Sequence, residues 1–395
     1  MTPAARAAAA IEVLDLWEAG DQRAEKVLRD WGRANRYAGS GDRRAIGDLV
    51  FTCIRRRRSL LTTHGATGGR GMILGLVMDE GADPADIFSG AKYAPAPLTA
   101  SESAQPTSPA SDPEKFDHPD WMEASLKASL GTGYSDVMSA LQSRAPIGLR
   151  VNRMKATVAE AADALSNDGV ETISSTLDPD ALIAPPGARI AQAEAYLNGM
   201  VELQDPASQA AARLPGAKPG ETVLDYCAGG GGKTLAFAAH MEGKGRLIAH
   251  DISPDRLKQT AIRAERAGVQ VECRDAEDMA GLKGACDLVF VDAPCTGSGS
   301  WRRDPEGKWR LTADEFASMQ ALQREVFASA LGYVAPGGRL AYATCSVFAE
   351  ENEDLANWAL AQFPDLEPGA GLNLVPAELN DGFYCCVFFL QKEHA

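Results

Sequence analysis

Residues 1–92 carry apolar side chains at intervals of three and four residues, with polar residues between them. The apolar series are Ala9, Val13, Leu16 and Trp17; Val27, Leu28 and Trp31; and Ile46, Leu49, Val50, Cys53 and Ile54. This spacing places each series on one face of a helix, where it can pack against other helices. We therefore predict an all-helical domain over residues 1–92.

The pattern changes twice in the following part of the chain. Residues 94–118 are rich in proline, serine and alanine, which predicts a linker or a long mobile loop, and helical spacing resumes after it. Residues 147–152 alternate like a strand, and Val158–Asp168 has the pattern of a helix. We predict a linker with helices over residues 93–146 and a small α/β domain over residues 147–203.

Residues 204–395 alternate regularly between strand-like and helix-like segments. The strand-like segments are Thr222–Cys227, Arg246–Asp251, Gln270–Asp275, Asp287–Asp292, Arg339–Cys345 and Phe383–Leu390, and helices are predicted at Pro254–Ala267, Asp314–Val334 and Glu350–Gln362. This alternation predicts one domain with a mostly parallel sheet. Ligands of such sheets bind beyond the carboxyl ends of the strands, so residues that follow the strands are the candidates for chemistry.

Length and composition narrow the class of protein. The chain has 395 residues, 45% of them apolar, which suits two or three soluble domains. No apolar run approaches the ~20 residues of a membrane span, and Glu12 and Asp15 interrupt the first apolar stretch, unlike in a signal peptide. The eight cysteines form no CxxC pair and histidines are few, so we expect free thiols and no metal site. We expect a cytoplasmic monomer without membrane contact.

Charge is unevenly distributed along the chain. The formal net charge is −15, but residues 1–70 carry 13 Lys/Arg against 8 Asp/Glu, while the remaining residues carry 26 against 46. The basic side chains gather at Arg43, Arg44 and Arg55–Arg58. A local basic patch on an acidic protein favours selective binding of a folded RNA, and the alternative is an ordinary solvated helix end.

A glycine-rich stretch, CAGGGGKT at residues 227–234, follows the first strand of the predicted sheet. A phosphate-binding P-loop would need a glycine where Cys227 stands, so that pattern fails. Four glycines without Cβ atoms still let a ligand approach bare backbone N–H groups at the start of a helix. The stretch favours a Rossmann-like nucleoside site, and the alternative is a tight strand–helix turn without a ligand.

Two acids end the next two strands. Asp251 lies 22 residues after Gly229, where a Rossmann-type site places the acid that binds ribose hydroxyls. Asp275 ends the third strand and can accept a hydrogen bond from an adenine amino group. The alternatives are that Asp251 caps the helix beginning at Pro254 and that Asp275 caps a turn.

Two cysteines at strand ends carry the sharpest chemical signal: Asp292-Ala-Pro-Cys295 and Thr344-Cys345. Methylation of an amine needs no thiol, whereas carbon 5 of a pyrimidine becomes nucleophilic only after a thiolate adds to carbon 6. A second group must then remove the carbon 5 proton, so two thiols suit this scheme. The alternative is that both are structural thiols. Residues 298–303, with Trp301 and two arginines, are predicted to hold the base and its phosphates.

Several segments resemble the RsmB/Nop/Sun family of RNA cytosine-5 methyltransferases. They are QDPASQAAA (204–212), LDYCAGGGGKT (224–234), DAPCTGSGSWRRDPEGKW (292–309), YATCSVFAEENE (342–353) and DGFY (381–384). The resemblance extends from about residue 147 to the end, and LRVN (149–152) is similar to the small domain that precedes the catalytic fold. Residues 33–60 resemble, more loosely, a NusB-like RNA-binding helical domain. The resemblance implies a class I, Rossmann-like methyltransferase domain over residues 204–395.

The resemblance also implies roles for individual residues. Cys345 would be the nucleophile toward carbon 6, Cys295 would abstract the proton and release the enzyme, and Asp292 and Lys233 would contact the base. The residues implied to hold S-adenosylmethionine are Cys227, Ala228, Gly229, Gly230, Gly231, Gly232 and Lys233, with Asp251, Asp275 and Asp292. The family's loop usually reads Ala-Ala-Pro-Gly-Gly-Lys, and Gly229-Gly230 stand here in place of Ala-Pro. The change makes the loop more flexible before binding.

We therefore expect an enzyme that methylates carbon 5 of a cytosine in RNA, with 16S ribosomal RNA as the leading substrate. One alternative is the same reaction on tRNA. Another is a non-catalytic RNA-binding factor of ribosome assembly. The set of Lys233, Asp292, Cys295 and Cys345 argues against a binding factor, which has no use for two thiols at strand ends.

Overall fold

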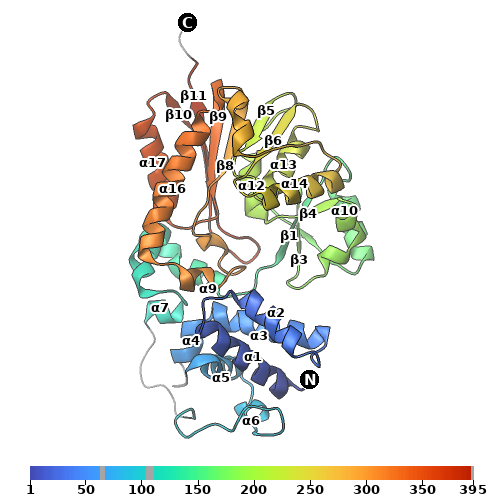
Figure 1. Cartoon of the computed structure of the whole chain (residues 1–395), viewed down its shortest axis with the longest axis vertical. Coiled ribbons are helices and arrows are strands. Elements are labelled where there is room, and N and C mark those ends of the chain that lie inside the picture. The colour runs from blue at the N-terminus through green and yellow to red at the C-terminus, as the bar shows by residue number, and fades with distance from the viewer. Residues whose placement is uncertain (63–66, 104–110, 393–395) are drawn as a thin grey trace. The chain divides into compact units, whose positions relative to one another are not determined.

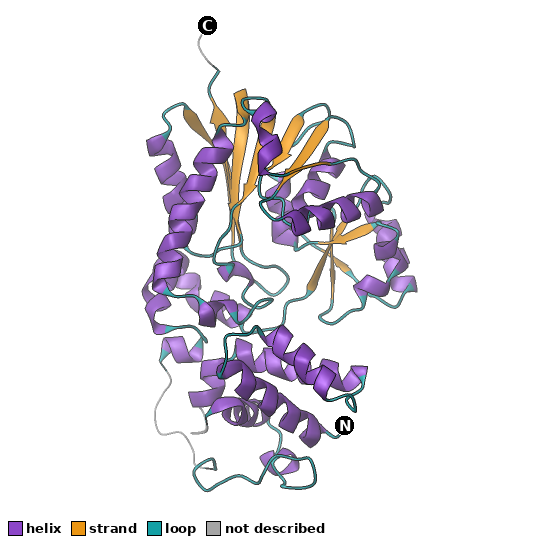
Figure 2. Ribbon diagram, viewed as in Figure 1, coloured by secondary structure: helices purple, strands orange, loops and turns teal. Residues whose placement is uncertain are grey.

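The computed structural model describes residues 1–62, 67–103 and 111–392 and divides into two compact units. The first unit comprises Met1–Lys127, Thr132–Arg144 and Trp301–Arg310. The second comprises Ala128–Gly131, Ala145–Ser300 and Leu311–Ala395. Figures 1 and 2 show their elements.

The first unit is helical, as the apolar spacing predicts. Its helices are α1 (Pro3–Glu18), α2 (Ala24–Ala34), α3 (Ser40–Arg55), α4 (Arg57–Thr62), α5 (Gly68–Asp79), α6 (Pro84–Ile87), α7 (Asp112–Lys115), the start of α8 (Glu123–Leu130) and α9 (Tyr134–Leu141). Thr2 caps α1 by accepting from the Ala5 N–H, and Pro3 suits the first helical turn. Val13, Ile46 and Val50 are fully buried. No described helix is long and apolar enough to cross a membrane.

The proline- and serine-rich stretch predicted at residues 94–118 is only partly within the described residues, since 104–110 lie outside them. Its described end is ordered into α7, where Ser111 and Glu114 form a capping box. Asp117 follows and is fully buried. Its carboxylate accepts hydrogen bonds from the N–H groups of Arg58 and Ser59 at the start of α4. This end of the stretch is therefore part of the helical core, not a mobile loop.

Residues 301–310 complete the helical unit although they lie far along the chain. They include α15 (Gly307–Arg310). Glu306 is 1% exposed and accepts hydrogen bonds from the Trp17 indole N–H and the Ala24 N–H, each at 3.1 Å. The buried Lys308 donates to the carbonyl of Arg55 at 2.9 Å. The helical unit therefore depends on a segment that the sequence pattern assigns to the sheet domain.

The predicted basic patch at Arg55–Arg58 is wrong as a free surface. Arg55 is buried, with its Nε donating to the Arg302 carbonyl at 3.0 Å. The other three arginines form ion pairs, Arg56 with Asp79 at 2.7 Å, Arg57 with Glu18 at 2.8 Å and Arg58 with Asp120 at 2.5 Å. Their charges are therefore paired with carboxylates of the same helical unit. Arg43 and Arg44 are exposed and stay available to an anionic partner.

A small antiparallel sheet begins the second unit. Its strands β1 (Ile147–Val151), β2 (Ile173–Ser174), β3 (Ala181–Ala184) and β4 (Val201–Leu203) have the order β2-β3-β1-β4. Helices α10 (Val158–Asn167) and α11 (Glu194–Leu197) accompany it. Thr157 and Glu160 form a capping box at the start of α10. The strand and helix predicted for this domain are confirmed.

The large sheet has seven strands in the order β10-β11-β9-β8-β5-β6-β7. The strands are β5 (Thr222–Asp225), β6 (Arg246–His250), β7 (Glu272–Arg274), β8 (Cys286–Asp292), β9 (Val334–Thr344), β10 (Leu366–Leu374) and β11 (Phe383–Leu390). Strands β5 to β9 pair in parallel, and β11 and β10 add antiparallel pairs. This is the predicted Rossmann-like, mostly parallel sheet.

Helices cover both faces of this sheet (Figures 1 and 2). Consecutive residues of β8 enter different cores. Leu288 and Phe290 pack with α12 (Pro206–Arg213) and α13 (Gly232–His240), while Val289 and Val291 pack with α16 (Ala313–Leu331) and α17 (Glu353–Gln362). Both faces are therefore buried, which explains why the strands are continuous apolar runs.

One helix end and one strand differ clearly from the prediction. The helix expected to reach Val334 ends at Leu331, because the chain turns at Gly332 and Val334 already pairs with Cys286 in the sheet. Strand β10 was not predicted at all. Its residues include Pro368, Gly369 and Gly371, most of its side chains are exposed, and its register with β11 shifts between Pro368 and Gly371. An exposed edge strand lacks the apolar alternation on which the prediction rests.

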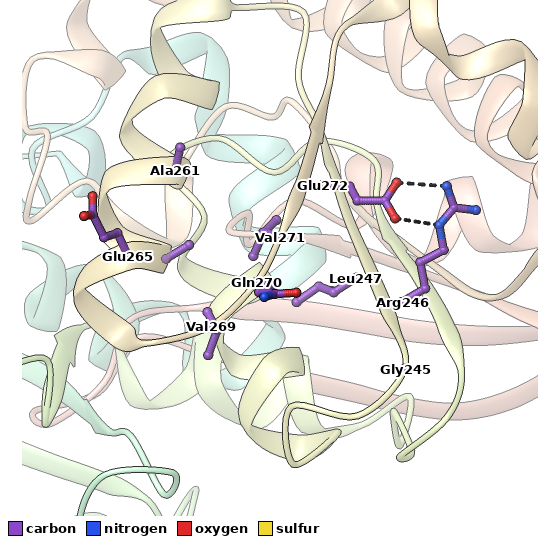
Figure 3. A pocket seen from close by; sticks show the side chains of 10 residues that line it. Gly245, Arg246, Leu247, Ala261, Glu265, Val269, Gln270, Val271 and Glu272 are labelled. Carbon is purple, nitrogen blue, oxygen red and sulfur yellow. Dashed lines mark hydrogen bonds and ion pairs between the residues drawn. The ribbon is translucent and has the colours of Figure 1, made fainter.

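Figure 3 shows the lining of a groove. The groove lies at the amino ends of parallel strands, and the predicted chemistry follows their carboxyl ends. Its lining includes Arg246 and Glu272, the first residues of β6 and β7. These side chains form a two-pronged ion pair with both N–O distances at 2.8 Å. Because ligands of open α/β sheets bind at the carboxyl ends, we do not assign the cofactor to this groove.

Candidate active site

The strand order reverses at β5. Strands β6 and β7 lie on one side of β5, and β8 and β9 lie on the other. The glycine loop follows β5, so it lies at the point where connections leave in opposite directions and a crevice opens at the carboxyl ends. The predicted residues that follow β6, β7, β8 and β9 lie along the same edge of the sheet.

The glycine loop presents bare backbone. Gly229 has φ +55° and Gly231 has φ +80°, conformations that favour glycine. A Cβ added to Gly229 would have no other group within 4 Å, so the space beside this residue is open. A Cβ on Gly231 would meet Thr260 of α14 (Pro254–Ala267) at 2.8 Å. The loop is thus open at Gly229 and packed at Gly231, which fits a cradle for a nucleoside cofactor.

The two strand-end acids have different surroundings. Asp251 is buried, and its Oδ2 and Oδ1 accept from the N–H groups of Gly229 at 2.9 Å and Ser253 at 2.8 Å. Asp275 is exposed and caps the 3-10 turn η4 (Ala276–Leu282) by accepting from the Glu277 N–H at 3.1 Å. Asp275 therefore caps a turn, as its alternative predicts, whereas Asp251 holds the turn before α14 and the N-cap of that helix is Ser253. Each carboxylate oxygen has a second lone pair that can still accept from a ligand.

Another acid, Asp225, lies at the end of β5 and was missed as a site residue. It is fully buried, and its Oδ2 accepts from the Thr234 hydroxyl at 2.6 Å. Burial raises its pKa to about 7, although the Thr234 hydrogen bond opposes the shift. Cys227 follows two residues later, and burial raises the pKa of its thiol. Its neighbour Ala228 donates its N–H to the His250 carbonyl at 2.8 Å.

The register of two parallel strands brings the predicted thiols together. Asp292 of β8 lies beside Ala343 of β9, and the next amide, that of Ala293, donates to the Ala343 carbonyl at 2.9 Å. Each strand then ends in a loop that carries a cysteine. The Sγ atoms of Cys295 and Cys345 lie 3.5 Å apart, and both thiols are only partly buried.

The two thiols differ in acidity. A hydrogen bond from Cys295, with the charge of Lys233 as a weaker contribution, lowers the pKa of Cys345 although burial opposes the shift. The same hydrogen bond to Cys345, together with burial, raises the pKa of Cys295. These directions favour Cys345 over Cys295 as the thiol that ionises.

A charged pair lies beside the thiols. Lys233, in the first turn of α13, is buried and its Nζ lies 2.6 Å from Oδ2 of Asp292. Burial is the largest single influence on the pKa of Lys233 and lowers it, but the charge and hydrogen bond of Asp292, with smaller contributions from Asp225 and Cys345, together shift the pKa upward. The Nζ also lies 4.6 Å from the ring centroid of Phe383, in the DGFY segment. The structure thus brings together Lys233, Asp292, Cys295 and Cys345.

Sequence reasoning missed two buried residues that hold the Cys295 loop. Oε1 of Glu351 accepts from the Thr296 N–H and from Nε2 of Gln323, both at 2.9 Å. Nε2 of Gln323 also donates to the Pro294 carbonyl at 2.9 Å. Glu351 and Gln323 therefore fix the backbone on both sides of Cys295. Gln323 had a signal, because it lies on the buried face of α16 with Phe316 and Phe327.

Hydroxyl groups join the two cysteine loops to each other. The buried Ser298 accepts from the Val347 N–H at 2.9 Å, and its hydroxyl lies 2.9 Å from that of Ser346. The Gly299 N–H donates to the Cys345 carbonyl at 2.9 Å. The distance between the thiols is therefore set by a network that connects both loops.

The prediction that residues 298–303 hold the RNA base is wrong for Trp301 and Arg302. Each is 1% exposed and belongs to the helical unit. Their side chains are part of its packing, so neither presents a face on which a base can stack. Sequence reasoning read an aromatic and two arginines as a nucleic-acid contact because the three-dimensional partners of the segment lie far away in sequence.

Comparison of the sequence with known proteins finds a family and relatives that this chain resembles. A family described as 16S rRNA methyltransferase RsmB/F matches residues 214–381, and an RsmF/B-like ferredoxin-like domain matches residues 118–186. Ribosomal RNA small subunit methyltransferase B of Vibrio cholerae is 34% identical over 294 residues, which cover 72% of this chain and 67% of the relative. The same enzyme of Klebsiella pneumoniae is 31% identical over 284 residues, covering 68% of this chain and 65% of the relative.

Solved structures are similar as well. The crystal structure of PH0851 has a TM-score of 0.77 and 26% identity, covering 98% of this chain and 99% of that chain. A methyltransferase homolog protein from Pyrococcus horikoshii has a TM-score of 0.61 and 26% identity, covering 70% of this chain and 97% of that one. The curated relatives extend beyond the match, because it spans about two thirds of their length.

Proposed function

Because the chain belongs to the RsmB/F family of S-adenosylmethionine-dependent methyltransferases, we propose that it methylates carbon 5 of a cytosine in 16S ribosomal RNA. One observation carries the proposal. Two thiols of opposite pKa shift lie 3.5 Å apart beside the Lys233–Asp292 pair. A methyltransferase of exocyclic amines needs neither thiol, since nitrogen is already nucleophilic.

The cofactor would lie along the glycine loop. The loop residues 227–232 and Lys233 would line the cofactor, with Asp251 near its ribose and Asp275 near its adenine. Asp292 would lie near the transferred group. The open space beside Gly229 supports this placement. When bound, S-adenosylmethionine supplies an electrophilic methyl group to the carbon 5 that Cys345 has activated.

Cys345 starts the reaction as a thiolate. Its sulfur forms a bond to carbon 6 of the cytosine, and the electron pair of the 5,6 double bond moves toward carbon 5. The lowered pKa of Cys345 supports this role, because only the thiolate attacks. Asp292 would hydrogen-bond the N3/N4 edge of the cytosine, and Lys233 would stabilise the charge that develops on the ring.

Cys295 ends the reaction. Its thiol first loses its own proton to water, and the resulting thiolate then takes the proton from the methylated carbon 5, the 5,6 double bond re-forms, and the bond between carbon 6 and the Cys345 sulfur breaks. The hydrogen bond to Cys345, burial and the Cys345 charge all raise the pKa of Cys295 in the free protein, and the first and third of these depend on a free Cys345 sulfur. Once Cys345 is bonded to carbon that charge is gone, so the pKa of Cys295 falls at the step that needs a base.

The substrate would be a cytosine that leaves its stack. Extrusion of a base costs a few kcal/mol, which favours an unpaired loop of the RNA. Exposed Arg43 and Arg44 of the helical unit would contribute phosphate contacts.

Trapping with 5-fluorocytosine RNA tests the proposal, because fluorine at carbon 5 prevents release. Wild-type protein should form a stable covalent complex with this RNA when S-adenosylmethionine is present. Cys345→Ala should form none. With ordinary RNA, Cys295→Ala should accumulate a covalent complex with methylated RNA, seen as a slow band on a denaturing gel. An adduct with Cys345→Ala and none with Cys295→Ala would reverse the two roles, and no adduct of the wild-type protein with the fluorinated RNA would leave only RNA binding.

A further inference from the structure

The glycine loop has neighbours that hold it from outside. Gly229, Gly230, Gly231 and Gly232 are consecutive, and glycine loses more conformational freedom on ordering than any other residue. A loop of this composition is pre-organised for a ligand only if other groups fix its peptide planes. The side chains that fix the carbonyl groups of the loop come from one helix, α14.

Arg263 of α14 fixes one of these peptide planes. Its Nη1 donates to the Gly230 carbonyl at 2.6 Å. The guanidinium is itself fixed, because its Nε and Nη2 donate to Oε2 of Glu202 at 3.1 and 3.0 Å. Glu202 is 1% exposed and lies in β4. One rigid ion pair therefore places a charged donor against a loop carbonyl.

Thr260 of the same helix fixes the preceding peptide plane. It is fully buried, and its hydroxyl donates to the Gly229 carbonyl at 3.0 Å. Asp251 accepts from the N–H of the same Gly229 at 2.9 Å. Both sides of Gly229 are therefore bonded, while the space beside its Cα is open to a ligand.

We infer that Arg263 and Thr260 are positioning residues for the cofactor: they fix the carbonyls of Gly230 and Gly229 and so keep the loop in its binding conformation before the cofactor arrives. This inference rests on the proposed cofactor site. The two side chains bond the carbonyl groups of the loop, so they affect the cofactor through the conformation of the loop.

The chain offers a matched control in Arg266, one helical turn along α14. Its guanidinium also pairs with Glu202, through Oε1 at 2.5 Å, but its other face lies 4.1 Å from the ring centroid of Tyr196 and not against the loop. Either arginine can be removed while the other still neutralises the buried Glu202. Arg263→Met and Arg266→Met therefore remove the same kind of ion pair, and only the first frees the loop.

The experiment compares these variants by calorimetry with S-adenosylmethionine and by amide hydrogen exchange of the loop in the cofactor-free protein. Arg263→Met should raise the Kd about fivefold, the order expected when a loop must be ordered on binding, and should speed exchange of a peptide covering residues 227–235. Thr260→Val should act in the same direction. Arg266→Met should lower the Tm as much as Arg263→Met and leave the Kd within about twofold of wild type. The kcat at saturating cofactor should be unchanged in all three.

Equal Kd values and equal loop exchange in the two arginine variants would overturn the inference alone, with the cofactor site intact. Failure of wild-type protein to bind S-adenosylmethionine would overturn the cofactor site and the inference together. Faster exchange in Arg263→Met without any change in Kd would overturn the link to the cofactor, because the loop would be held for another purpose.

Discussion

The edge of the large sheet at the carboxyl ends of its parallel strands has two halves, one built mainly of backbone groups and the other of side chains. The half proposed for the cofactor, after β5 and β6, is mostly backbone: consecutive glycines held by Asp251, Thr260 and Arg263. The half proposed for the base, after β8 and β9, consists of side chains: the partly buried thiols of Cys295 and Cys345 and a buried hydrogen-bond network that holds their loops. The first half is shaped by neighbours that surround it, and the second is fixed through its own hydrogen bonds.

The difference follows from what each half has to do. A cofactor is recognised by close approach to peptide groups, so side chains must be absent, and the remaining problem is the entropy of the loop. A proton transfer and a carbon–sulfur bond need individual atoms at fixed separations, and an error of about 1 Å there reduces the rate about a hundredfold. Damage to the cofactor half should therefore change affinity, and damage to the base half should change kcat.

Among substitutions that leave both thiols in place, the largest effect is expected from Asp292→Asn. The substitution leaves Lys233 buried without its charge partner and removes the acceptor for the cytosine edge. We expect kcat to fall by about 10²–10³, the range of a lost electrostatic contact in an active site. The Kd for S-adenosylmethionine should change less than threefold in calorimetry. A large loss of cofactor affinity with a normal kcat would show that Asp292 serves cofactor binding and not the reaction at the base.

Glu351→Gln should have the next largest effect. Oε1 of Glu351 accepts from the N–H groups of Thr296 and Gln323, and Oε2 accepts from the Thr296 hydroxyl. A glutamine that keeps its oxygen toward the two N–H groups therefore places its NH2 group against that hydroxyl and removes the charge beside the Cys295 loop. We expect kcat to fall about 10- to 100-fold, with more covalent RNA complex at steady state because release is slowed. Glu353→Gln, at a partly exposed position, is the control and should keep wild-type activity. Equal effects of both substitutions would mean that the loop does not depend on Glu351.

Asp251→Ala tests the cofactor half. It removes the acceptor of the Gly229 and Ser253 N–H groups and the expected ribose contact. Loss of a charged hydrogen-bond partner is worth about 1.5–3 kcal/mol, so the Kd for S-adenosylmethionine should rise at least tenfold. At saturating cofactor the kcat should recover. An unchanged Kd in calorimetry would remove Asp251 from the cofactor site.

The smallest effect concerns Asp225. Its folded-state pKa is about 7, against 3.8 for an unperturbed carboxyl, so the folded protein binds the extra proton between these values and loses stability as pH rises through the window. The amide introduced by Asp225→Asn does not titrate. The free energy of unfolding of this variant relative to wild type should therefore rise between about pH 5 and 7.5, by about 1–3 kcal/mol. Urea titrations at several pH values measure this difference, and a flat difference would show that the carboxyl stays ionised.

The parallel strands and the convergence of their ends could be predicted from sequence, because buried strands leave continuous apolar runs and parallel strands present their carboxyl ends on one edge. Lys233, Asp292, Cys295 and Cys345 were named on that basis and on the family resemblance. What could not be predicted depends on distant partners. The ion pairs of Arg56 and Arg57 and the bonds of Glu351 are fixed by tertiary packing, and no local spacing encodes them.

The sequence did not predict strand β10 or the burial of Trp301, and the two reasons are related. An edge strand with glycines and exposed side chains has no periodic signal, and its pairing with β11 is decided by the partner strand. Trp301 was read by residue type, and residue type does not distinguish an aromatic that stacks on a base from one that is 1% exposed in a helical core.

The placement of residues 301–310 in the helical unit has a consequence for protein synthesis. At about 5–20 residues per second, a ribosome needs on the order of ten seconds or more to proceed from the helices to Glu306. Until then the nascent chain presents the Trp17 indole and the Ala24 amide without their carboxylate acceptor. The amino-terminal unit is thus completed only after β8 has been translated. A chain that ends before residue 301 lacks the carboxylate that accepts from Trp17 and Ala24.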